Sequence, residues 1–170
     1  MKKIIYEIIK EPLGLIGLAL VSLVIFLSFG ADLFSPFAPS QINIRDKLQN
    51  PSLIHILGTD QLGRDLFSRV LYGGRIALKV ALISIFISMI IGIVVGIAAA
   101  IGKKWLDNFL LFIFDTIRSF PTIMFALAIV TLFGPSLETI IFIVILTQSP
   151  IYARIVRTQT LMVINSEYIQ

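Results

Sequence analysis

The chain has 170 residues, of which 57% are hydrophobic and only 14% are charged. Soluble domains carry about 25% charged residues, so this composition excludes an ordinary soluble domain and predicts an all-α integral membrane protein. The absence of cysteine excludes disulfides and thiolate metal sites. The net charge of +4 comes from basic residues at the ends of apolar runs, which fits membrane topology better than nucleic-acid binding.

The first apolar run, residues 13–34, is long enough to cross a hydrocarbon core of about 30 Å as a helix. It follows a tail, residues 1–12, whose three lysines favour a cytoplasmic N-terminus. A cleavable signal peptide is the alternative, because Ser28-Phe29-Gly30 resembles a cleavage site. Since the apolar core of a signal peptide is usually about 7–15 residues long, we expect an uncleaved anchor.

Residues 35–74 contain prolines and charged side chains and predict an extracytoplasmic loop with short helices, one of them over residues 60–72. The basic residues of this loop are a mild exception to the positive-inside rule. His55 is the only histidine of the chain, and we interpret it as a surface hydrogen-bonding residue rather than a ligand.

Three further spans are expected over residues of about 76–101, 109–133 and 137–163. Gly92 and Gly96 form a G-x-x-x-G pair that permits close approach of a neighbouring helix. Four spans beginning with a cytoplasmic N-terminus return the C-terminal end to the cytoplasm, in agreement with the basic residues that follow the second span and end the fourth.

Two sets of polar residues fall within or beside these spans. Asp115 and Arg118 are three positions apart, and we expect a structural ion pair between them. Gln148, Ser149 and Pro150 lie in the middle of the fourth span, where they are costly unless they face protein or water. Gln148 either lines a solvated path or makes an interhelical hydrogen bond.

The sequence offers no catalytic constellation, so we do not expect an enzyme. The single histidine and the absence of a G-x-S-x-G elbow argue against a serine hydrolase. Residues 96–104 lack the glycine spacing of a phosphate-binding loop. Translocation remains, with a non-transporting four-helix scaffold or a small channel as the alternative.

Residues 55–78, HILGTDQLGRDLFSRVLYGGRIAL, resemble the segment before the second span of dipeptide, oligopeptide and nickel ABC-importer permeases. More specifically, these residues resemble the C-type subunit, whose pattern is HxLGTDxLGRDxxSRxxYGxRxSL. This sequence has Ala77 where that pattern has a serine. Further matching segments are Phe120-Pro121, Phe133-Gly134-Pro135, and Tyr152–Arg157 followed by Ser166–Ile169.

The resemblance implies a type I importer permease fold, in which residues 75–170 are part of a six-span transmembrane domain. In this family a cytoplasmic loop between the fourth and fifth spans forms a helix that docks on the ATPase. Ser166, Glu167 and Tyr168 would be the beginning of that coupling loop. The chain is then expected to be an N-terminal part of a permease, from a truncated gene or an incomplete sequence.

The implied function is a permease subunit of an ATP-driven, binding-protein-dependent importer of peptides or nickel in the cell (inner) membrane. The implied partners are a sister permease in a heterodimer, two ATPase subunits that use ATP, an extracytoplasmic binding protein and the lipid bilayer. No cofactor, metal or nucleic acid is expected on this chain. Gln148 and Ser149 are candidates for the pathway lining. Arg64, Asp65 and Arg69 are candidates for outer-loop contacts, with local ion pairing as the simpler alternative.

Overall fold

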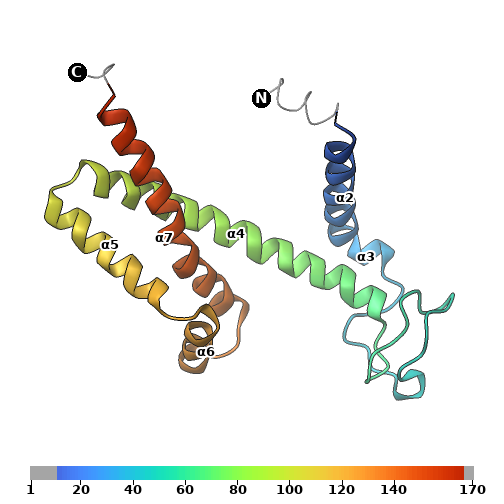
Figure 1. Ribbon diagram of the computed structural model, residues 1–170. Helices are drawn as coiled ribbons and strands as arrows, with labels where there is room; N and C mark the ends of the chain where they lie inside the picture. The colour runs from blue at the N-terminus through green and yellow to red at the C-terminus, as the bar shows by residue number, and fades with distance from the viewer. Residues whose placement is uncertain (1–10, 167–170) are drawn as a thin grey trace. The chain divides into compact units, whose positions relative to one another are not determined.

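The computed structural model describes residues 11–166 and is helical apart from the loops that join its helices. Figure 1 shows the helices α2 (Pro12–Phe29), α3 (Ala31–Phe34), α4 (Leu66–Ile101), α5 (Lys104–Ser119), α6 (Thr122–Phe133) and α7 (Leu137–Ile164). A short 3-10 helix, η1 (Ile44–Asp46), lies in the loop between α3 and α4. Three helices, α2, α4 and α7, are long and apolar enough to cross a membrane, and the bent pair α5–α6 would make a fourth span. The all-α membrane fold class is thereby confirmed.

The chain divides into two compact units, Met1–Lys79 and Val80–Gln170. The described part of the first unit contains α2, α3, the loop with η1, and the first turns of α4. The second contains the rest of α4 together with α5, α6 and α7.

The separate short helix expected over residues 60–72 is not present, because α4 begins at Leu66 and continues without a break to Ile101. Asp65 stands directly before the helix and its carboxylate accepts the backbone N–H of Ser68, at 2.7 Å, as an N-cap does. Helix therefore starts ten residues before the apolar run at Ile76, since nothing between the cap and the apolar run interrupts it.

The third span is also different from the expected single helix. Its two parts, α5 and α6, are bent by 92° at Phe120 and Pro121. Phe120 has φ −83° and ψ 136°, which is the extended conformation that a following proline imposes on the residue before it. The proline thus ends α5, and a new helix begins directly after it.

Within the second unit, α4 and α7 pack closely at Gly92 and Gly96, as the G-x-x-x-G pair predicts. A Cβ atom at Gly92 would collide with Tyr152, and one at Gly96 would lie 2.6 Å from the carbonyl oxygen of Ala153. Ser88 and Ser84 lie one and two turns before Gly92 on α4. Both are fully buried, and their hydroxyls have no hydrogen-bond partner within residues 11–166.

Candidate functional site

The outer loop is organised around a buried carboxylate, Asp65. His55 Nδ1 lies 3.0 Å from one of its oxygens, and the Ser68 hydroxyl donates to the other at 2.7 Å. The imidazole also stacks on Phe37, with ring centroids 4.9 Å apart, and only 7% of His55 is exposed. The expectation of a surface histidine is therefore wrong: the ring is part of the core of the loop.

These hydrogen bonds decide the protonation of Asp65. Burial raises the pKa of this carboxyl, but the hydrogen bonds from Ser68 and His55 outweigh burial and hold the pKa below its ordinary value. Asp65 is consequently a structural anion at neutral pH.

A second carboxylate, Asp60, binds two of the three arginines of residues 55–78, Arg64 and Arg69. Its Oδ2 accepts from Arg64 Nε at 2.8 Å and from Arg69, and its Oδ1 accepts the backbone N–H groups of Leu62 and Arg64. Burial raises the pKa of Asp60, yet these hydrogen bonds and the charge of Arg64 bring it far below its ordinary value. Two glycines make the tight loop possible, because Gly58 and Gly63 have φ of +74° and +70°.

Arg75 joins the start of α4 to the end of α2. Its guanidinium donates to the carbonyl oxygens of Ser28, at 3.2 Å, and Phe29, at 2.8 Å, which lie at the C-terminus of α2. It also pairs with Asp32 at 2.8 Å, and the Tyr72 hydroxyl donates to the same carboxylate. The arginine thus donates to two carbonyl groups at the end of α2, where a helix leaves carbonyl oxygens without intrahelical partners, and the Ser28 oxygen accepts a backbone N–H as well.

Two ion pairs connect α5 to α7. Arg157 donates to both oxygens of Asp107, at 2.6 and 2.5 Å, and Arg154 donates to Asp115 at 2.5 Å. The expected pair of Asp115 with Arg118 is therefore wrong. The spacing of three residues permits a pair between Asp115 and Arg118 on one helix, but Arg154 of α7 binds the Asp115 carboxylate instead. Among the described residues, Arg118 and Asp115 do not form an ion pair.

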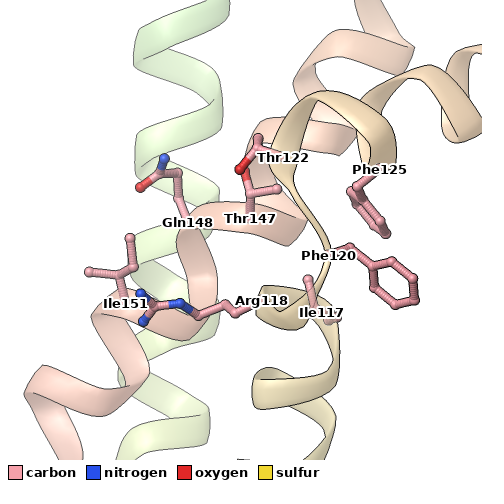
Figure 2. Close-up of a pocket in the computed structure, with 8 residues that line it drawn as sticks. All are labelled: Ile117, Arg118, Phe120, Thr122, Phe125, Thr147, Gln148 and Ile151. Atoms are coloured by element: carbon pink, nitrogen blue, oxygen red, sulfur yellow. The ribbon is translucent and has the colours of Figure 1, made fainter.

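Arg118 lies instead beside a cavity of about 240 Å³ at the break between α5 and α6. Figure 2 shows its side chain extending from the end of α5 toward Ile151 of α7. The residues that line the cavity are Ile117, Arg118, Phe120, Thr122, Phe125, Thr147, Gln148 and Ile151. The cavity therefore combines aromatic and aliphatic walls with hydroxyl, amide and guanidinium groups.

The two pathway candidates of the fourth span have different positions. Gln148 lies in the wall of this cavity. Ser149 is 4% exposed and its hydroxyl donates to the carbonyl oxygen of Ile145 at 2.6 Å, so it is part of the packing of α7.

At the end of α7, Ser166 is the last described residue, and its hydroxyl donates to the carbonyl oxygen of Val163 at 2.7 Å. Glu167 and Tyr168, the other two residues expected to begin the coupling loop, lie outside the described residues.

Arg118, Thr122 and Thr147 were not predicted to line a cavity. The signal for it was Pro121 in the middle of an expected span, because a proline-broken helix needs protein or water around its freed backbone groups. In the described part of the chain, no three His, Asp or Glu side chains gather as a metal site would require.

The chain is similar to known membrane transport proteins. Residues 92–170 match the family described as binding-protein-dependent transport system inner membrane component. The chain is 32% identical to the dipeptide transport system permease protein DppC of Alkalihalophilus pseudofirmus over 160 residues, 94% of this chain and 53% of the relative. It is 35% identical to the glutathione transport system permease protein GsiD of Pectobacterium atrosepticum over 151 residues, 88% of this chain and 50% of the relative.

A third relative is the probable peptide ABC transporter permease protein y4tQ of Sinorhizobium fredii, 37% identical over 161 residues, 95% of this chain and 55% of the relative. The chain thus spans about half the length of the curated relatives it matches. With apolar helices of membrane-spanning length, a family match over residues 92–170 and alignment with permease proteins along nearly all of its residues, the chain is similar to binding-protein-dependent transport system inner membrane components.

Proposed function

We propose that this chain forms part of the translocation pathway of an ATP-driven, binding-protein-dependent importer, and that its substrates are peptides. The observation that carries the proposal is the cavity at the break between α5 and α6. Irregular backbone is tolerated at membrane depth only where it is buried in protein or lines a cavity. Transporters use such interrupted helices to form substrate sites.

The same observation separates this proposal from a non-transporting scaffold. A scaffold only has to pack its spans against one another, and a proline break lowers the stability of a helix without adding to that packing. Peptides are favoured as substrates because the relatives DppC, GsiD and y4tQ are named as dipeptide, glutathione and peptide permeases.

The proposed partners are a sister permease that completes the pathway, two ATPase subunits that hydrolyse ATP, and an extracytoplasmic binding protein that delivers the peptide. Ser166, Glu167 and Tyr168, which follow α7, would begin the contact with an ATPase subunit. Because Arg64, Asp65 and Arg69 make internal hydrogen bonds, we infer that they orient the outer loop rather than bind the substrate.

The proposed topology has a cytoplasmic N-terminus and places the loop around Gly58 outside the cytoplasm. Reporter fusions after Gly58 and after Gln170 test this, and a result with both reporters on the same side would contradict the four-span arrangement.

Uptake of a labelled dipeptide tests the function itself. Cells that lack the gene are compared with cells in which the native gene is restored, and labelled nickel serves as the second substrate. We expect loss of dipeptide uptake in the deletion strain and recovery on complementation. Normal dipeptide uptake in the deletion strain, where no second peptide importer is expressed, would refute the proposal.

A further inference from the structure

We propose that the cavity at the α5–α6 break is an anion site that binds the free C-terminal carboxylate of a peptide. The identity of the ligand as a peptide rests on the proposed function. That the ligand carries a carboxylate is inferred only from the side chains and backbone around the cavity.

Arg118 is the first argument. Of the three arginines at the α5–α7 contact, Arg154 and Arg157 pair with acidic residues of α5, whereas Arg118 has no acidic partner between residues 11 and 166. None of the residues that line the cavity is acidic. A guanidinium presents its donors as a planar fork that matches the two oxygens of a carboxylate. The cavity thus carries a positive charge without a counter-ion.

The backbone beside it is the second argument. The helix α6 has 12 residues and begins at Thr122, and its N-cap residue, Pro121, contributes no side-chain hydrogen bond. The first N–H groups of a helix have no intrahelical acceptor and form the positive end of its dipole. Because Thr122, the first residue of α6, lines the cavity together with Arg118, the positive end of this helix dipole lies at the cavity and favours an anion there.

The neutral groups of the lining fit a peptide terminus as well. The Gln148 amide and the Thr122 hydroxyl provide further donors. The Thr147 hydroxyl directs its proton to the carbonyl oxygens of Ile143 and Val144, at 3.0 and 3.2 Å, and so can only accept from a ligand. Aromatic and aliphatic walls complete the cavity and suit an apolar terminal side chain.

A simpler account of Arg118 is that it stabilises the C-terminal carbonyl groups of α5, in whose last turn it lies. That account explains the arginine but neither the cavity next to it nor the uncapped start of α6. The cavity of about 240 Å³ is smaller than the roughly 300–1,000 Å³ of sites that enclose a whole drug-sized ligand. It therefore has room for one end of a peptide.

Protection of Arg118 from phenylglyoxal, which modifies guanidinium groups, tests the site directly. The native complex in vesicles of neutral phosphatidylcholine is treated with the reagent alone, with dialanine, or with dialaninamide, which lacks the carboxylate. Modification of Arg118 is followed by mass spectrometry, with the exposed Arg45 as internal reference. At a dialanine concentration about ten times its Kd, we expect the rate at Arg118 to fall roughly tenfold by mass action. Dialaninamide should leave it unchanged.

Three outcomes would overturn the inference. The rate at Arg118 is the same with and without dialanine; or Arg118 is unreactive before any ligand is added, because a partner subunit covers it; or vesicles with anionic phosphatidylglycerol protect it and dialanine adds nothing, because a lipid phosphate occupies the site.

Uptake kinetics supply the second measurement. R118Q should raise KM for dialanine roughly tenfold or more and leave dialaninamide uptake unchanged, because only the charged carboxylate loses its partner. R118K should recover part of the affinity. K104Q removes the same charge from the other end of α5 and should leave KM unaltered. If the wild-type complex takes up no peptide, the proposed function fails, while the protection experiment still decides whether the cavity binds a carboxylate.

Discussion

Replacing Asp107 with asparagine tests how strongly α5 is held against α7. Arg157 donates two hydrogen bonds to this carboxylate, and the side chains of Arg157 and Asp107 are only 25% and 17% exposed. Hydrogen bonds to charged groups contribute about 1.5–3 kcal/mol, and removal of one partner leaves a covered charge unpaired. We therefore expect D107N to lower the free energy of unfolding by about 2 kcal/mol.

The pair of Asp115 and Arg154 is the matched control on the same two helices. It is held by one hydrogen bond, and the side chains of Arg154 and Asp115 are 51% and 60% exposed. Exposed ion pairs contribute only about 0.2–1 kcal/mol. The comparison of D107N with D115N thus isolates the effect of burial and of the second hydrogen bond.

Heating in detergent, followed by fluorescence-detected size exclusion, measures both variants. In a chain of this size about 1 kcal/mol corresponds to a Tm change of about 2–4 °C, so D107N should lower Tm by about 4–8 °C and D115N by less than about 4 °C. A double-mutant cycle with R157Q should give a coupling of the size lost in D107N. Equal losses in D107N and D115N, or a coupling near zero, would refute the reasoning.

Two further predictions concern the packing of α4 and the outer loop. G96A should lower the yield of folded protein and cost about 1–3 kcal/mol, because the new methyl group meets the Ala153 carbonyl, while G73A, at an open position of the same helix, should be neutral or slightly stabilising. Both are measured as Tm in detergent, and equal effects of the two would contradict the close packing. The pKa of Asp65 is lowered on folding, so its hydrogen bonds stabilise the loop fully above the ordinary pKa of 3.8, and this contribution is lost as the pH falls through the lower folded pKa. An NMR titration of the Asp65 carboxyl carbon should show the lowered pKa, and a midpoint at or above 3.8 would contradict it.

The spans were predictable because apolar length alone identifies a membrane helix. The boundary of α4 was not, since residues 66–75 mix apolar side chains with Ser68, Arg69 and Arg75, and only the capping carboxylate of Asp65 shows that helix already begins at Leu66. The bend at Pro121 was visible as a proline, but its angle of 92° depends on how α6 packs against α7. A local cap thus decided the start of α4, whereas tertiary packing, which sequence periodicity does not contain, decided the bend.

For the polar residues, the kind of environment could be predicted from the sequence, but the hydrogen-bond partners could not. A polar environment around Gln148 was predictable, because an amide in the middle of a span is costly in lipid. The partners of Asp115 and His55 were not, because both are chosen by segments distant in the sequence: Arg154 is 39 positions from Asp115, and Asp65 is 10 positions from His55. The spacing along the sequence predicted Arg118 as the partner of Asp115, and a position in a loop predicted that His55 would face solvent.

The two prolines of this region act on the same cavity. Pro121 separates α5 from α6, and Pro150, inside α7, removes a backbone donor and so frees a carbonyl group one turn earlier. The residues around them, Phe120 and Thr122 on one side and Gln148 and Ile151 on the other, all line that cavity. A proline inside a helix costs about 3 kcal/mol, and two interruptions at one place give nothing to a bundle that only has to pack. Polar groups, Thr122 and Gln148 among them, thus gather where both helices are interrupted, in keeping with the rule that irregular backbone at membrane depth is buried in protein or lines a cavity.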